Sequence, residues 1–234
     1  MKTLLSFGGG VNSTALIVWL RKTEPETFRD MHIVFSDTGG ELPETYTHLA
    51  AFEGWLKDNG QKMIRVGRPD TLEEYCLETK STPMSKWRWC TDKWKIRPIQ
   101  KWAEENLGET YTQLMGIASD EAHRAKPNQI KGITNRFPLV DQGITRQGCF
   151  KILSDAGIRG VAKSGCFYCP LMPSGQFVEL KKAHPDLFAR AVAMEKNSGN
   201  LLKHKPLEDI VGCKDKQIGL FGFENECDSG YCMT

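Results

Sequence analysis

Short apolar runs alternate with longer amphipathic segments along the first half of the chain. Each run ends at a glycine or a polar residue, which is typical of a buried strand that meets a turn. The segments between them carry apolar side chains at helical spacing without an internal breaker. The runs that predict strands are Thr3–Phe7, His32–Phe35, Met63–Val66 and Tyr111–Ile117, and the segments that predict helices are Ser13–Lys22 and Glu44–Asn59.

Strands that alternate with helices predict an α/β fold, in which a Rossmann-like parallel sheet has helices on both faces. Asn12 or Ser13 is the expected N-cap of the first helix, and Gly60 is the expected stop of the second. The alternation fades after about residue 118, where an irregular, cysteine-rich C-terminal extension begins.

Within this extension we expect an extended piece at Phe137–Leu139, a loop over Gly157–Gly175 and little regular structure from Gly212 onward. The absence of a low-complexity linker predicts one domain over residues 1–234, divided into a core at 1–118 and a second region at 119–234. The helices expected in the second region are Thr145–Ala156, Ser174–Ala183 and Pro185–Lys196.

Composition excludes several classes of protein. Hydrophobic residues make up 40% and charged residues 26%, which argues against disorder, collagen-like repeats and coiled coil. The 31 Lys+Arg against 29 Asp+Glu give a net charge of +2, so overall charge offers no argument for nucleic-acid binding. The apolar start Met1–Leu5 stops before Gly8–Gly10, and no stretch approaches the ~20 apolar residues of a membrane helix. We therefore expect a cytoplasmic protein with no membrane partner, in which the eight cysteines are ligands or redox groups.

Three consecutive glycines, Gly8, Gly9 and Gly10, join the first strand to the first helix. Glycines let backbone N–H groups approach an anion, and the helix N-terminus adds further donors, so the loop predicts phosphate binding. A Walker loop is excluded because no lysine lies between Lys2 and Lys22. A dinucleotide fingerprint is matched only in part, whereas the run 9–14 matches the pyrophosphatase loop well.

The segment after the second strand, Phe35–Tyr46, resembles the Asp-Thr-Gly-x-Glu-x-Pro-Glu-Thr signature of the phosphoadenosine phosphosulfate (PAPS) reductase family. That family has the adenine nucleotide alpha-hydrolase fold and includes sulfonucleotide reductases and the sulfurtransferase of DNA phosphorothioation. Further matching segments follow in the family's order: Arg88–Thr91, Lys95–Pro98, Gly116–Glu121, Phe137–Leu139, Gly143–Thr145 and Cys166–Pro170.

The resemblance implies an adenine nucleotide, either ATP or APS/PAPS, bound by the core at 1–118. Family members usually carry Ser where Gly8 stands, and often a Lys and an Asp where Val11 and Asn12 stand, so phosphate binding is a firmer expectation than pyrophosphate cleavage. The residues that would hold the nucleotide are Ser6, Gly8, Gly9, Gly10, Asn12, Ser13, Thr14, Asp37, Thr38 and Gly116.

Four cysteines are candidate metal ligands, because four thiolates suit either tetrahedral zinc or an iron–sulfur cluster. Their arrangement, single Cys90, single Cys149 and the pair Cys166/Cys169, resembles the 4Fe–4S ligation of the cluster-bearing branch of the family. The alternative is that Cys90 or Cys149 is a small buried hydrophobe. Reductases of the family typically have a Cys-Cys pair where Cys90 stands alone, which favours the sulfurtransferase-like branch.

The remaining cysteines carry less information. Cys76 is expected in the core, and Cys213 is unassigned. Cys227 and Cys232 in the tail partly match the catalytic tail cysteine of family reductases, and we expect them to act as nucleophiles; incidental thiols in a disordered tail are the alternative.

Arg88 and Lys95 lie at family motif positions in a basic and aromatic stretch, and we expect them to contact a sulfur-bearing or phosphate-bearing substrate; Arg124 is a second candidate. The leading hypothesis is an ATP-using sulfurtransferase with a 4Fe–4S cluster. The alternatives are an APS/PAPS reductase and a non-catalytic nucleotide-binding module. A nucleic-acid acceptor, a sulfur-donor or reductant protein and a second copy of the chain are the partners that such chemistry would use.

Overall fold

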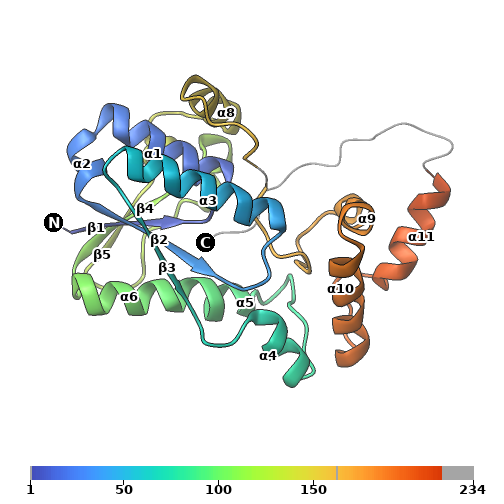
Figure 1. The fold of residues 1–234 in the computed structure, drawn as a ribbon. Coiled ribbons are helices and arrows are strands. Elements are labelled where there is room, and N and C mark those ends of the chain that lie inside the picture. Colours follow the sequence, from blue (N-terminus) through green and yellow to red (C-terminus); the bar gives the residue numbers. More distant parts are fainter. Residues whose placement is uncertain (1, 162, 218–234) are drawn as a thin grey trace.

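A parallel sheet lies at the centre of the computed structural model, which describes residues 2–161 and 163–217 (Figure 1). The strand order is β3-β2-β1-β4-β5, and each neighbouring pair is parallel. The strands are β1 Thr3–Phe7, β2 Met31–Asp37, β3 Met63–Gly67, β4 Tyr111–Met115 and β5 Ile133–Arg136.

Strand β1 is the centre of the sheet because β2 lies on one side of it and β4 on the other. Ser6 is in register with Val34 of β2 and with Met115 of β4. In open parallel sheets a crevice forms where the strand order reverses, at the carboxyl ends of the strands. The glycine loop follows β1 directly and therefore lies at this crevice.

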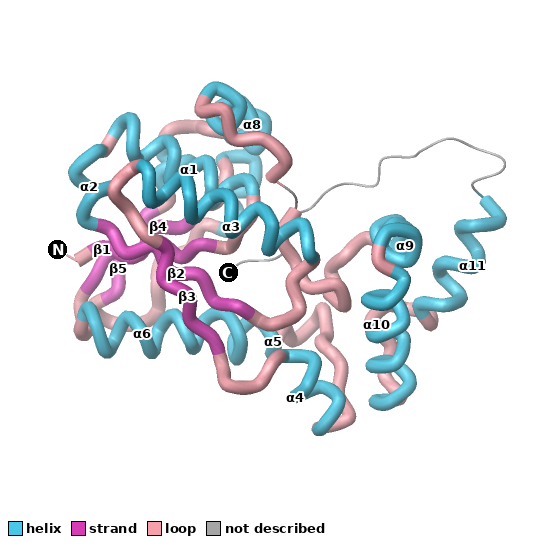
Figure 2. Tube along the Cα trace, viewed as in Figure 1, coloured by secondary structure: helices cyan, strands magenta, loops and turns pink. Residues whose placement is uncertain are grey.

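Helices cover both faces of the sheet, as Figure 2 shows with the strands in magenta. Helices α1 and α3 pack on one face in a core that contains Leu16 and Leu49, and α6 packs on the other face through Ile99 and Ala103. This arrangement confirms the predicted α/β fold class. The helices before residue 118 are α1 Val11–Thr23, α2 Pro25–Asp30, α3 Pro43–Asp58, α4 Leu72–Glu78, α5 Trp89–Thr91, the π-helical turn η1 Asp92–Ile96 and α6 Arg97–Leu107.

A second apolar core lies beyond the carboxyl ends of the strands, where the C-terminal helices meet α4 and η1 (Figure 1). Trp94, Phe167, Tyr168 and Phe177 are almost completely buried there. The buried carboxylate of Glu195 accepts hydrogen bonds from the backbone N–H groups of Leu202 and Leu207 at 2.8 and 2.9 Å. The elements after residue 118 are the 3₁₀ helix η2 Ser119–Arg124, then α7 Pro138–Asp141, α8 Arg146–Asp155, α9 Ser174–Ala183, α10 Pro185–Ser198 and α11 Leu207–Gln217.

Three local expectations from the sequence are wrong. The N-cap of α1 is Gly10, with no side-chain hydrogen bond, and not Asn12 or Ser13. Phe137–Leu139 is not extended, because Pro138 begins α7 at a position that suits proline; the strand β5 ends just before it. Helix α11 occupies part of the C-terminal region in which little regular structure was expected, and its buried Leu207 and Val211 join the second core.

Within the described part of the chain, none of the helices has both the length and the apolar character that crossing a membrane requires.

Candidate functional site

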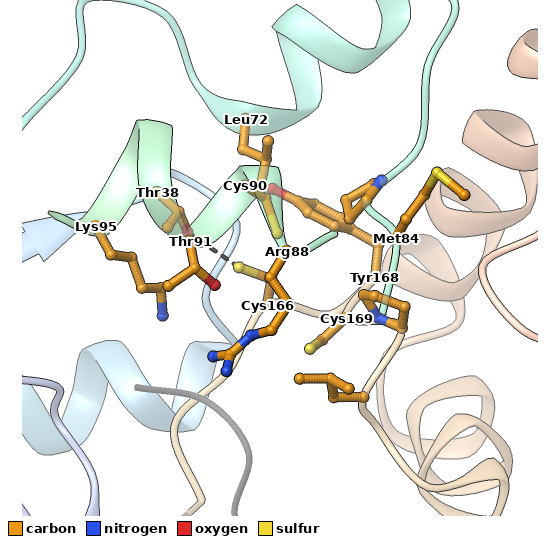
Figure 3. A pocket seen from close by; sticks show the side chains of 13 residues that line it. Thr38, Leu72, Met84, Arg88, Cys90, Thr91, Lys95, Cys166, Tyr168 and Cys169 are labelled. Carbon is orange, nitrogen blue, oxygen red and sulfur yellow. Dashed lines mark hydrogen bonds between the residues drawn. The ribbon is translucent and has the colours of Figure 1, made fainter. Parts of the chain in front are cut away.

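Three of the four cysteines predicted as metal ligands line one pocket (Figure 3). Cys90 lies in α5, whereas Cys166 and Cys169 lie in the loop before α9. The pocket lies at the carboxyl side of the sheet, next to Thr38, which directly follows β2. The fold thus brings together thiols from two segments that are far apart in the sequence.

The loop that carries Cys166 is held against the family signature after β2. Leu42 N–H donates to the Gly165 carbonyl at 3.2 Å, and Phe167 N–H donates to the Gly40 carbonyl at 3.0 Å. A Cβ on Gly40 would overlap the hydroxyl of Tyr168, so the close approach of the two segments requires glycine there. These contacts fix where the Cys166 side chain lies.

A buried carboxylate connects this loop to η1. Lys95 Nζ donates to Glu41 Oε1 at 3.1 Å, and the side chains are 13% and 1% exposed. Thr38 Oγ1 donates to the same oxygen at 3.3 Å, and Cys166 Sγ lies 3.8 Å from it. Thr38 Oγ1 is also 3.2 Å from Cys166 Sγ. Sequence reasoning missed Glu41, although its place as the glutamate of the family signature could have indicated it.

Arg88, the other predicted substrate contact, also lines the pocket. Its backbone has a φ of 42°, in the left-handed region that non-glycine residues rarely adopt. Its Nε and Nη2 atoms are buried and have no hydrogen-bond partner among the described residues. The structure therefore brings Arg88 and Lys95 into the same pocket as the three thiols.

Cys149 does not reach this pocket. It lies on α8, fully buried in the core that α8 forms with α1, and burial raises the pKa of its thiol to about 12. Cys76 is buried in the second core, as expected, and burial raises the pKa of its thiol to about 12 as well. The predicted nucleophiles Cys227 and Cys232 lie outside the described residues.

The glycine loop leads directly into α1, and the hydroxyl groups in the first turn of α1 form hydrogen bonds back to this loop. Ser13 Oγ and Thr14 Oγ1 donate to the Gly10 carbonyl at 3.2 and 2.8 Å, and Thr14 Oγ1 lies 3.2 Å from His48 Nε2. Because the N-cap of α1 uses no side chain, a ligand at this end of the helix would meet backbone N–H groups. Gly8 and Gly9 of this loop are buried, and Ser6 is half-buried in β1.

Asn12 links the glycine loop to the segment that follows β4. Its Nδ2 donates to Glu121 Oε2 at 3.1 Å, while Arg124 Nη1 donates to Glu121 Oε1 at 2.8 Å. Its Oδ1 is buried without a hydrogen-bond partner among the described residues. An aspartate in place of Asn12 would face the Glu121 carboxylate and repel it, whereas the Asn12 amide donates to it.

Two further residues predicted to bind nucleotide have packing roles in this structure. A Cβ on Gly116 would lie 2.6 Å from Ser13 Cα, so glycine is needed for β4 to approach α1. Asp37 Oδ1 accepts hydrogen bonds from Tyr46 Oη and Gly39 N–H, both at 2.8 Å. Burial, followed by the bond to Asp37, raises the pKa of Tyr46 above its ordinary value.

The glycine loop lies in contact with the segment that leads to Cys166. A Cβ on Gly10 would lie 3.0 Å from Ser164 Oγ, and Ser164 is two residues before Cys166. Among the described residues, no three His, Cys, Asp or Glu side chains are placed to hold a single metal ion. Three thiols spaced around one pocket fit the donor set of an iron–sulfur cluster, in which the thiolates bind different irons.

The phosphoadenosine phosphosulfate reductase domain matches residues 2–138. The chain belongs to this family. The match covers the glycine loop, the signature after β2, Arg88, Cys90 and Lys95, and ends before Cys149 and the Cys166/Cys169 pair.

This member of the PAPS reductase family is 26% identical over 199 residues to an uncharacterized protein of Methanocaldococcus jannaschii, an alignment that covers 80% of this chain and 40% of the relative. The chain spans about half the length of the curated relatives it matches, or less.

Two solved structures are similar to this chain. A PAPS reductase from Candida auris in complex with phosphate gives a TM-score of 0.49 at 17% identity and covers 68% of this chain and 74% of its own. The U34-tRNA thiolase NcsA from Methanococcus maripaludis, with its 4Fe–4S cluster, gives a TM-score of 0.45 at 14% identity and covers 100% of this chain and 77% of its own.

Proposed function

We propose that this chain is an adenine-nucleotide-dependent sulfurtransferase that holds a 4Fe–4S cluster on Cys90, Cys166 and Cys169. The observation that carries the proposal is that these three thiols line one pocket, while the loop of Cys166 touches the glycine loop at Gly10. A bound cluster supplies redox-active iron to that pocket.

Other residues of the chain would bind the nucleotide, position the pocket and transfer the sulfur. The N-terminus of α1 and its glycine loop would bind the phosphates of the nucleotide, next to Asp37 and Thr38. The Glu41–Lys95 ion pair holds Thr38 and Cys166 in place. With ATP, attack by an acceptor oxygen on the α-phosphate releases pyrophosphate, and a sulfur nucleophile then displaces AMP. We propose that Cys227 or Cys232 carries this sulfur as a persulfide received from a sulfur-donor protein. After its outer sulfur has displaced AMP, the other of the two thiols attacks the carrier sulfur, which leaves the transferred sulfur on the acceptor and forms a disulfide that a reductant protein reduces.

We propose nucleic acid as the acceptor. Trp87 is 72% exposed next to the pocket residue Arg88, and Lys86 beside it is exposed as well. An exposed indole with neighbouring cations can stack on an unpaired base and contact its backbone. The acceptor oxygen would then be presented at the mouth of the pocket.

The first test is calorimetry on anaerobically purified, cluster-loaded protein with ATP, APS and PAPS. Tighter binding of ATP supports the sulfurtransferase, whereas tighter binding of APS or PAPS indicates a sulfonucleotide reductase despite the single Cys90. Iron and acid-labile sulfide are measured on the same samples. Cys166→Ser should remove most of both, and Cys149→Ala, the matched control outside the pocket, should remove neither. Loss of the cluster only in Cys149→Ala would contradict the proposed ligands.

A further inference from the structure

His48 lies on the side of α3 that packs against the glycine loop. The loop comes so close to α3 that a Cβ on Gly9 would lie 3.2 Å from Leu49 Cδ2 and 3.7 Å from Thr45 Cγ2. His48, one position before Leu49, is only 7% exposed, and its ring stacks on Phe52 with the ring centroids 5.8 Å apart. The imidazole is therefore held in one orientation next to the loop that is expected to bind phosphate.

One ring nitrogen of His48 contacts the first turn of α1. Its Nε2 lies 3.2 Å from Thr14 Oγ1, and that hydroxyl donates to the Gly10 carbonyl at 2.8 Å. A hydroxyl has a single proton to donate, so Thr14 Oγ1 accepts from His48, and the neutral ring carries its proton on Nε2. Thr14 is completely buried, so water does not compete for either bond.

This chain of hydrogen bonds fixes the direction of the peptide group that begins α1. The Gly10 carbonyl also accepts from Thr14 N–H at 3.0 Å and from Ser13 Oγ at 3.2 Å, so its oxygen points into the helix. The first N–H groups of α1, which have no partner within the helix, are left to face the crevice at the carboxyl ends of the strands. A carbonyl oxygen turned toward the crevice would instead repel a phosphate.

The surroundings of His48 favour the neutral ring, because burial lowers its pKa below the ordinary value of 6.5. The other charged or titratable side chains of α3 are bound elsewhere or lie more than two turns away: Glu44 pairs with His184, Tyr46 with Asp37 and Glu53 with Arg65, and Lys57 and Asp58 are in the last turn. The elements that pack against this part of α3 carry Arg21 and Lys22 in the last turn of α1 and His32 and Asp37 in β2, and β1 has none.

Phosphate groups at the first turn of α1 would add negative charge on the far side of Thr14 from His48. A nearby negative charge favours the protonated form of a histidine. The two effects are reciprocal, so a ligand that promotes protonation of His48 binds more tightly as the pH falls.

We propose that His48 is a positioning residue of the phosphate site, which holds the Gly10 carbonyl away from the ligand through Thr14 and binds a proton from solvent when phosphate groups occupy the glycine loop. The inference rests on the nucleotide binding proposed above and adds to it a residue of α3, outside the loop itself.

The experiment uses the full-length, cluster-loaded chain under anaerobic conditions, with ATP as the probe. The five histidines are labelled with ¹³C and ¹⁵N, and the His48 resonance is identified by its loss in His48→Gln. Nitrogen chemical shifts give the tautomer, and a pH titration with and without ATP gives the pKa. Because both are measured on the wild type, they do not depend on whether a more disruptive variant folds.

Calorimetry at pH 8 and pH 6 then gives the ATP affinity of the wild type and three variants. His48→Gln keeps a donor near the position of Nε2 but does not titrate, and His48→Leu has neither property. His32→Gln is the matched control, at a histidine that packs against Trp102 on the other face of the sheet.

The neutral ring of His48 should carry its proton on Nε2, and ATP should raise its pKa. At pH 8, ATP should bind His48→Gln within about twofold of the wild type and His48→Leu about three- to tenfold more weakly, the loss expected for one hydrogen bond. From pH 8 to pH 6, the affinity of the wild type and of His32→Gln should increase more than that of His48→Gln.

A neutral ring protonated on Nδ1, a pKa of His48 that ATP leaves unchanged, or wild-type affinity in His48→Leu would each overturn the inference and leave nucleotide binding intact. Failure of the wild type to bind ATP would overturn the proposed function as well.

Discussion

The carboxylate of Glu41 and the ammonium of Lys95 form an ion pair at 3.1 Å behind the cysteine pocket, and both side chains are largely withdrawn from water. The pair also orders Thr38 and Cys166, which lie 3.3 and 3.8 Å from Glu41 Oε1. Removal of one partner leaves the other charge buried and uncompensated.

Glu41→Gln should therefore lower the free energy of unfolding by about 3–5 kcal/mol and reduce the iron content of the purified protein. Chemical denaturation and iron analysis provide the two measurements. Glu53→Gln breaks the more exposed pair with Arg65 and should cost only about 0–1 kcal/mol without loss of iron. Equal effects of the two variants would show that Glu41 has no special role at the pocket.

Gly40→Ala tests the contact between the signature segment and the cysteine loop. Its Cβ would overlap the Tyr168 hydroxyl, so we expect a loss of about 1–3 kcal/mol in stability and weaker cluster retention. The control is Gly54→Ala in α3, where a Cβ meets nothing within 4 Å. That substitution should stabilise the helix by about 0.5–1 kcal/mol. Tolerance of alanine at Gly40 would mean that Tyr168 can move aside.

Gly116→Ala should weaken nucleotide binding and leave the cysteine pocket intact. The added Cβ lies 2.6 Å from Ser13 Cα and would displace the start of α1, which carries the proposed phosphate donors. Calorimetry with ATP and iron analysis on the same sample separate the two effects. Gly165→Ala, where a Cβ meets nothing within 4 Å, is the matched substitution that should leave ATP binding unchanged. Unaltered ATP affinity in Gly116→Ala would place the nucleotide elsewhere.

Asn12→Asp should destabilise the protein, because it places a second carboxylate about 3.1 Å from Glu121 Oε2. Glu121→Gln in the same chain should restore much of the loss, and a double-mutant cycle of unfolding free energies measures the coupling. Additive effects of the two substitutions would show that the Asn12–Glu121 contact does not explain the asparagine.

The buried thiols predict a specific alkaline response. Burial raises the pKa of Cys149 from its ordinary value of 9.0 to about 12, so folding favours the neutral thiol. The resulting stabilisation is complete below pH 9.0 and is lost as the pH rises toward 12. Cys149→Ala should flatten the profile of unfolding free energy against pH over this window.

At pH 8, iodoacetamide should modify Cys90 and Cys169 in cluster-free protein before Cys76 and Cys149. Early modification of Cys149 would contradict its burial.

Local patterns in the sequence were sufficient for the strands β1 to β4 and for the helices α1, α3, α8, α9 and α10, but not for α6, which covers one face of the sheet. Buried strands such as Thr3–Phe7 and amphipathic helices such as Pro43–Asp58 bury apolar side chains at a fixed period, which is visible in the residues themselves. Strand β5 was missed because Ile133 is its only large apolar residue and it lies at the edge of the sheet. Helix α11 was missed because its buried residues face a core made by distant segments.

The sequence by itself determined the family, the glycine loop and the identity of the cysteines, because each of these is a property of residue type and spacing. Only the tertiary structure decided which cysteines share a pocket: Cys90 and the Cys166/Cys169 pair meet there, and Cys149 is buried in the core that α8 forms with α1. It also placed Glu41 against Lys95 and left the bidentate edge of Arg88 buried without a partner in the described chain. Burial, ion pairing and close approach depend on residues far apart in sequence, and folding alone brings these together.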